Sequence, residues 1–120
     1  MKKLELILPL PPSMNRLWRT GKGGAVYRSP KYEAWRVPAM WQASVQAKGI
    51  KFEGSYKLTL LAVRPDKRKR DLDNLFKAAS DCLVAAGIVD DSKCEWLEGR
   101  WIKEGPQCTL IIEEINRDDE

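Results

Sequence analysis

The residues of this sequence best suited to chemistry are a few aspartates and one lysine. Asp71 and Asp73 are separated by one residue, Lys77 lies four positions further on, and the pair Asp90 and Asp91 follows later. Carboxylates alone would repel a phosphate, so acidic residues that follow a strongly basic run typically act through a bound metal cation. The pattern therefore favours a metal-dependent nuclease.

The donor types indicate which ion would bind. The chain contains no histidine, which excludes Ser-His and Cys-His nucleophilic mechanisms and any histidine base. Aspartates offer hard oxygen ligands, which Mg²⁺ prefers, and Mn²⁺ is the alternative ion. In phosphodiester hydrolysis, a cation such as Lys77 would stabilise the developing negative charge or assist the leaving oxygen.

Positive charge is concentrated just before these acids. Residues 1–70 carry a net charge of +12 and residues 71–120 carry −8, and five of the seven residues from Arg64 to Arg70 are basic. Such a field fits a polyanionic partner, although a solvated basic surface without a partner is the alternative. We expect DNA phosphates to contact Arg16, Lys67, Arg68, Lys69 and Arg70.

The hydrophobic pattern predicts the elements that must position these residues. The order of elements indicates an α+β fold, a single small domain over residues 1–120 with a mixed sheet of about four strands and two main helices. We expect 94–102 and 108–112 to form a hairpin around Glu104-Gly105-Pro106, and 113–120 to be a frayed acidic tail. The expected strands are 4–8, 55–63, 94–102 and 108–112, and the expected helices are 29–48 and 74–86.

The first helix should bury a face formed by Tyr32, Trp35, Ala39 and Ala43. Pro38 should kink or split it. Trp35 and Trp41 are both expected to be packing anchors. The second helix should end at Gly87, and its predicted apolar stripe is Leu75, Ala78, Ala79, Cys82, Leu83 and Ala86.

The spacing of the acids suggests how a site could form. In extended backbone just before the second helix, Asp71 and Asp73 would face the same side, with Leu72 turned toward the core. Asp90 or Asp91 could then complete the site from the turn after that helix. The alternatives are that Asp71 and Asp73 cap the helix, that Asp73 and Lys77 form a surface ion pair, and that the acidic pair is an ordinary turn.

Composition limits the setting. No apolar run approaches the length of a membrane span, and the first residues lack a signal-peptide pattern, so a cytoplasmic protein is expected. The three cysteines, Cys82, Cys94 and Cys108, have neither the number nor the spacing of a disulfide framework or a zinc site. Reduced, mostly buried thiols are therefore expected.

Three motifs in register resemble the RusA family of Holliday junction resolvases over roughly residues 4–113. The resemblance implies a homodimeric, Mg²⁺-dependent endonuclease that binds four-way DNA junctions and introduces paired nicks, in bacteria and commonly on prophages and phages. It implies neither a membrane nor a small-molecule substrate. The motifs are Pro11-Pro12-Ser13-Met14-Asn15-Arg16, Arg70-Asp71-Leu72-Asp73-Asn74-Leu75-Phe76-Lys77 and Gly87-Ile88-Val89-Asp90-Asp91.

Matched position by position, the resemblance places the catalytic aspartates at Asp71, Asp73 and Asp91 and the essential lysine at Lys77. Asp90 would form the turn or support the ligand. The connection before the acidic pair is about one residue shorter than the family pattern, which leaves Asp90 and Asp91 both open as the third ligand. Two other functions remain: a nuclease of the same fold that acts on other branched DNA, and a non-catalytic basic DNA-binding module.

Overall fold

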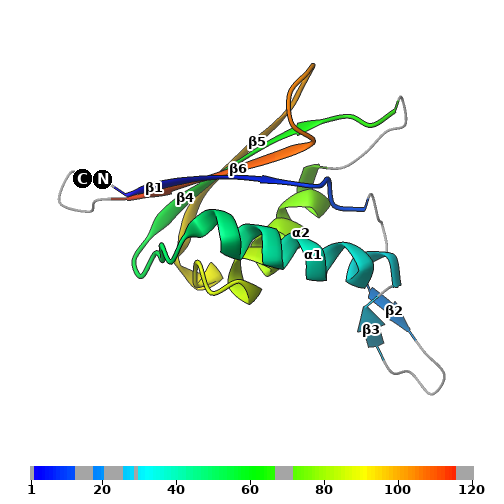
Figure 1. The fold of residues 1–120 in the computed structure, drawn as a ribbon, viewed down its shortest axis with the longest axis horizontal. Coiled ribbons are helices and arrows are strands. Elements are labelled where there is room, and N and C mark those ends of the chain that lie inside the picture. The colour runs from blue at the N-terminus through cyan, green and yellow to red at the C-terminus, as the bar shows by residue number, and fades with distance from the viewer. Residues whose placement is uncertain (1, 13–17, 21–25, 29, 67–71, 116–120) are drawn as a thin grey trace.

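A mixed four-stranded sheet forms the framework of the fold (Figure 1). The computed structural model describes residues 2–12, 18–20, 26–28, 30–66 and 72–115. The strand order is β1-β6-β4-β5, with β4 and β5 parallel and the other neighbours antiparallel. The strands are β1 (Lys3–Leu8), β4 (Tyr56–Val63), β5 (Cys94–Ile102) and β6 (Cys108–Glu114). The predicted α+β fold with a four-stranded mixed sheet is confirmed.

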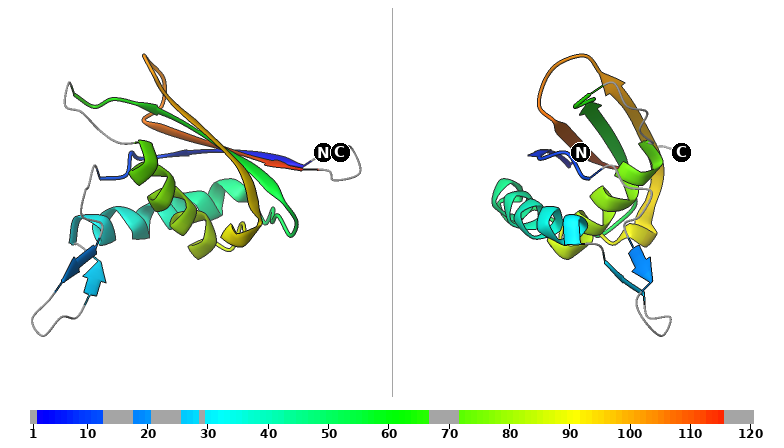
Figure 2. Two further views of the ribbon diagram at one scale, coloured as in Figure 1. Left: turned by 180° about the vertical axis from the view of Figure 1, so that it is seen from behind. Right: turned by 90° about the vertical axis from the view of Figure 1, so that its right-hand side faces the viewer.

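Helices α1 (Pro30–Ala47) and α2 (Leu72–Ala85) cover one face of this sheet (Figure 2). On β4, Leu58, Leu60 and Ala62 are fully buried beneath them, because alternate residues of a strand point to the same face. The predicted strand is confirmed, although burial does not alternate strictly, because Thr59 on the other face is also buried. In the described part of the chain, no helix is long and apolar enough to cross a membrane.

The predicted hairpin of residues 94–102 and 108–112 is wrong, although both segments are strands. β6 pairs with β1 and β4, whereas β5 pairs only with β4, so that β4 separates them. The connection from β4 through α2 to β5 is a crossover between parallel strands, and it places β5 at the sheet edge. β6 also extends to Glu114, so the first two residues of the expected frayed tail, Glu113 and Glu114, lie in the sheet; residues 116–120 are outside the described part.

A small antiparallel hairpin precedes α1. It consists of β2 (Trp18–Thr20) and β3 (Val26–Arg28), in a region where no strand was predicted. The signal was present, because aromatic and β-branched residues flank a glycine-rich connection on both sides.

Helix α1 buries Tyr32, Trp35, Ala39 and Ala43, as predicted. Pro38 does not split the helix, which continues through it as one element. Trp41, however, is 63% exposed, so its assignment as a packing anchor is wrong. Six residues after Trp35, it points well away from the buried face of a helix with 3.6 residues per turn.

Helix α2 begins at Leu72, two residues earlier than expected, and ends as predicted before Gly87. Gly87 has a φ of 76°, a left-handed conformation that suits glycine. Its N–H donates to the carbonyl of Val84 at 2.9 Å, and the N–H of Ile88 donates to that of Leu83 at 3.0 Å. These bonds form a Schellman motif, which ends the helix and turns the chain toward the acidic pair.

The thiols are mostly buried, as expected. Cys82 and Cys108 are buried and Cys94 is half-buried, all without a disulfide. Burial raises the pKa of Cys82 to about 11 and that of Cys108 to about 12. Neither buried thiol is therefore a nucleophile at neutral pH.

The two edges of the sheet differ. On β1, the side chain of Gln46 from α1 both accepts from the N–H of Ile7 and donates to its carbonyl, each at 2.7 Å. The outer edge of β5 pairs with no other strand in the described segments, and its Trp96 and Leu97 are each 54% exposed. An open edge of this kind is a template for pairing with another chain.

Replacing Gln46 by alanine should lower the free energy of unfolding by about 1–2 kcal/mol, because two backbone groups lose their partner. Urea denaturation would measure the change. Gln42→Ala, an exposed glutamine of the same helix, is the matched control and should change stability little. Equal losses in the two variants would show that the Gln46 contact contributes nothing specific.

Candidate active site

Asp73 lies in the first turn of α2 with an exposed side chain. It is thus helical, not in extended backbone before the helix as expected. Leu72 packs against the core, as predicted. Lys77, one turn further along, is also exposed, and the structure places no ion pair between it and Asp73. Both groups are therefore available to a ligand, while Asp71 lies outside the described residues.

The first turns of α2 rest on the sheet through Phe76 and Gly99. A Cβ atom built on Gly99 would lie 2.6 Å from Cζ of Phe76, closer than carbon atoms can approach. The glycine therefore provides the space that the phenyl ring occupies. Since Phe76 directly precedes Lys77, this contact sets the height of the start of α2 above β5.

Gly99→Ala should destabilise the protein by about 1–3 kcal/mol through overpacking against the ring. Phe76→Leu in the same chain should recover part of that loss, because the smaller side chain leaves room for the added methyl group. Thermal or urea unfolding of the two single variants and the double variant measures the coupling. Strictly additive losses would contradict the contact.

Asp90 and Asp91 have different roles at the far end of α2. Asp91 opens a short 3-10 helix, η2 (Asp91–Lys93), and is exposed. Asp90 caps it: its Oδ1 accepts from the Ser92 N–H at 3.0 Å and from the Ser92 hydroxyl at 2.8 Å. The hydroxyl bond first, and then the backbone bond, hold the pKa of Asp90 below its ordinary value. Asp90 is thus occupied in forming the turn, and Asp91 is not.

Tyr56 lies beneath this turn at the start of β4. The residue is fully buried, and its hydroxyl oxygen has no hydrogen-bond partner in the described part of the molecule. Its pKa is raised, first by burial and then by the Cys94 thiol and the carboxylates of Asp91 and Asp90. The phenol therefore stays neutral. The acidic pair lies near Tyr56, the first residue of β4.

Helix α2 separates the two parts of the expected site. From Asp73 to Ala85 the helix rises about 18 Å, at about 1.5 Å per residue. Figure 1 shows the chain passing from the start of α2 along its whole length before it reaches the turn that leads into β5. The structure therefore does not bring Asp91 to Asp73 within one chain. Among the residues that it describes, no three metal-ligating side chains form a cluster.

Comparison with known proteins gives the family. The family model described as Endodeoxyribonuclease RusA matches residues 9–113. This chain belongs to the RusA family of endodeoxyribonucleases. It is 39% identical over 94 residues to the Crossover junction endodeoxyribonuclease RusA of Aquifex aeolicus, covering 74% of this chain and 71% of the relative. Its identity to the enzyme of that name from Enterobacteria phage HK97 is 32% over 93 residues, covering 78% and 77%. To that of Escherichia coli K12 it is 35% over 94 residues, covering 78% of each chain.

The donor chemistry of this RusA-family chain fits a hard divalent cation. Asp73 and Asp91 both present exposed carboxylates, and oxygen ligands are what Mg²⁺ prefers. What one chain lacks is their proximity. The two aspartates fit the ion by type and exposure. For both kinds of carboxylate to meet at one ion, one of them would have to come from another chain.

The expected DNA-binding residues, Arg16 and 67–70, lie outside the described part of the chain. The neighbouring Arg64 is described and exposed, with its guanidinium 4.6 Å from the ring centre of Trp101. Nothing in the sequence marks these two residues as a pair. Arg64 directly follows β4, and Trp101 lies near the end of β5. The parallel pairing of these two strands, which was not predicted, brings the two residues together.

Proposed function

We propose that this protein is a Mg²⁺-dependent endonuclease that resolves four-way DNA junctions by paired symmetric nicks, as a cytoplasmic homodimer in recombination and repair. The names of its relatives specify crossover junctions. The observation that carries the proposal is the first two turns of α2. There, Asp73 and Lys77 are both exposed. In the sequence they come shortly after Asp71 and the basic run that ends at Arg70.

The length of α2 supports a dimeric site. If a two-fold axis passes near the middle of α2, the helix and its copy run antiparallel, and the partner subunit's Asp91 lies beside Asp73. Pairing of β5 with its own copy would use such an axis, and it would cover the exposed edge residues Trp96 and Leu97. One symmetry operation thus accounts for the open edge and for the separated carboxylates.

In this arrangement each centre takes Asp71 and Asp73 from one chain and Asp91 from the other. A bound Mg²⁺ would supply a nucleophile at neutral pH and offset the charge of the reacting phosphate. Lys77, one helical turn from Asp73, is placed to stabilise negative charge on the phosphate or the leaving oxygen. Asp90 holds the turn that presents Asp91. Because a four-way junction has near two-fold symmetry, two such centres can cut opposing strands.

A synthetic mobile four-way junction, incubated with Mg²⁺ or with EDTA, tests the proposal. The wild-type protein should make symmetric nicks only with the metal. Asp73→Asn should lower the nicking rate by about 100-fold or more, because it removes a ligand charge from the reacting centre. Junction binding should survive, since the basic run is unchanged.

Glu5→Gln is the matched control, an exposed carboxylate of β1, at the sheet edge opposite β5, and it should cleave at the wild-type rate. Nicking by Asp73→Asn at the wild-type rate would remove Asp73 from the reaction. Metal-independent binding without any cleavage would instead favour a non-catalytic DNA-binding module. Faster cutting of flaps or forks than of four-way junctions would assign a different branched substrate.

A further inference from the structure

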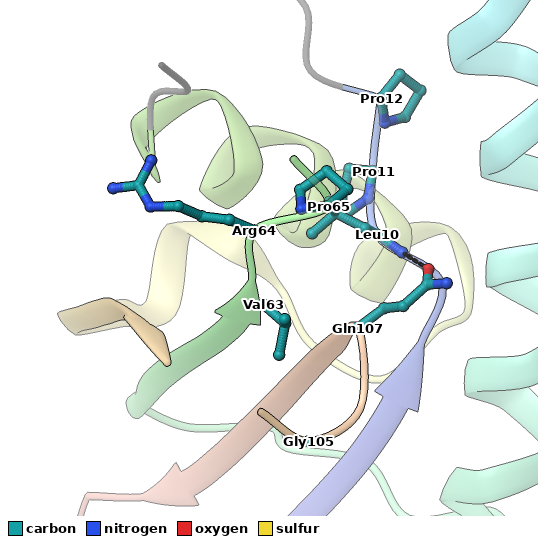
Figure 3. Close-up of a pocket in the computed structure, with 8 residues that line it drawn as sticks. All are labelled: Leu10, Pro11, Pro12, Val63, Arg64, Pro65, Gly105 and Gln107. Atoms are coloured by element: carbon teal, nitrogen blue, oxygen red, sulfur yellow. Dashed lines mark hydrogen bonds between the residues drawn. The ribbon is translucent and has the colours of Figure 1, made fainter. Parts of the chain in front are cut away.

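A cavity of about 540 Å³ lies where the ends of β1 and β4 meet the turn between β5 and β6 (Figure 3). Among its residues, the sequence had drawn attention only to the proline motif and to Arg64, the first residue of the basic run. Its volume is within the usual range for small-ligand pockets, about 300–1,000 Å³. It is lined by Leu10, Pro11, Pro12, Val63, Arg64, Pro65, Gly105 and Gln107.

The wall contributed by residues 9–12 is held rigidly. The indole N–H of Trp35 donates to the Pro9 carbonyl at 2.8 Å, and the N–H of Leu10 donates to Oε1 of Gln107 at 2.9 Å. The Gln107 carbonyl in turn accepts from the N–H of Val63 at 3.1 Å. The cavity is therefore preformed, which lowers the entropic cost of binding a ligand.

The chemistry of the lining favours a flat, largely apolar ligand with a negative charge beside it. Pro11, Pro12 and Pro65 have no backbone N–H to donate. Pro11 is fully buried behind the lining, so the apolar surface is presented by Pro12, Pro65 and Leu10. The cation is Arg64, whose exposed side chain extends away from the prolines (Figure 3), with its guanidinium 4.6 Å from the ring centre of Trp101. A nucleobase attached to a phosphate combines both features.

The cavity also lies close to the reacting centre along the chain. Pro65 precedes Asp71 by six residues, and the segment between them holds four of the five basic residues of the run. Six residues span at most about 20 Å even when fully extended. The phosphates that the basic run attracts therefore pass within a few nucleotides of the cavity.

We propose that this cavity binds an unpaired nucleobase of the branched DNA, next to the strand that is cut. The inference rests on the proposed function, and it adds a subsite for the substrate. A base at a branch point has already lost part of its stacking and pairing, so its removal from the helix costs less than within a duplex. Its face packs against Pro12, Pro65 and Leu10, and Arg64 neutralises its phosphate.

An abasic-site scan across a junction tests this subsite. Binding is measured in EDTA so that no strand is cut, with the base removed in turn at each position around the branch point. For the wild-type protein, one position should lose about 5- to 100-fold in affinity, the loss expected when one stacked base is removed. Removal elsewhere should have a smaller effect.

Two phenylalanine variants assign that loss to the cavity. Val63→Phe places a phenyl ring in the lining, where it would displace a base stacked in the cavity, and the intact and abasic junctions should then bind equally well. Leu61→Phe is the control: it lies on the same strand and face two residues earlier, is also half-buried, and lines no part of the cavity. It should retain the full abasic effect. Unfolding curves of the two variants verify that both are folded.

Several results would overturn the subsite. One is an abasic scan without any sensitive position in a protein that nicks junctions normally, which leaves the proposed function intact. Another is an abasic loss that persists in Val63→Phe, since the base would then bind elsewhere. A third is dissociation of the dimer by Val63→Phe, which would show that a partner chain fills the cavity. Failure of the proposed function is recognised separately, as absence of metal-dependent nicking.

Discussion

Mixing an Asp71→Asn chain with an Asp91→Asn chain should restore junction nicking that neither variant performs alone. In a mixed dimer whose centres each combine two chains, one centre receives both substitutions and the other receives none. Random exchange makes about half of the dimers mixed, each with one intact centre, so about a quarter of the wild-type centres should be active. Because each mixed dimer has one live centre, the products should be single nicks instead of paired ones.

The control for this experiment is a mixture of Asp71→Asn with Asp73→Asn. Those residues belong to the same half of the centre, so every centre of a mixed dimer carries one substitution, and nicking should not return. Tagged chains co-purified after mixing establish that subunits exchange. If exchange is complete and the first mixture remains inactive, each centre is built within one chain, and Asp91 is not shared between subunits.

The fold was predictable wherever burial alone decides the pattern. Leu58, Leu60 and Ala62 alternate in β4 because one face of the sheet lies under the helices. Pairing was not predictable in the same way. The segments 94–102 and 108–112 are neighbours in sequence with a turn between them, yet β4 pairs with both and separates them. Local periodicity identifies a strand but does not identify its neighbour.

The candidate site shows the same division. Residue types gave the oxygen donors and the cation, and the pattern placed Lys77 on the first turns of the helix, but it placed Asp73 in extended backbone before the helix instead of inside it. The position of Asp91 depends on where α2 ends, which Gly87 fixes, and thus on a distance of about 18 Å along the helix. The motifs do not show that this distance separates the two carboxylates. The separation matters only if both carboxylates bind one ion, and in that case a symmetric partner chain would supply the second carboxylate.

Replacing Arg68, Lys69 and Arg70 together by alanine should weaken junction binding and flatten its dependence on salt. Each phosphate contact adds about 0.9 to the slope of log affinity against log salt concentration. If all three residues contact phosphates, the slope should fall by about 3 for one chain and about 5 for a dimer. Titrations at several salt concentrations, with a labelled junction, measure this slope directly.

The control must remove the same charge from another place. Lys3, at the start of β1, and Lys48 and Lys51, between α1 and β4, are exposed, and their joint replacement by alanine changes the net charge equally. If the basic run contacts DNA directly, this control should lower affinity slightly and leave the slope nearly unchanged. Equal changes in both triple variants would mean that net charge attracts the junction without localised contacts. An unchanged slope in the first variant would place the phosphates on other residues, because counterion release follows the contacts that are made.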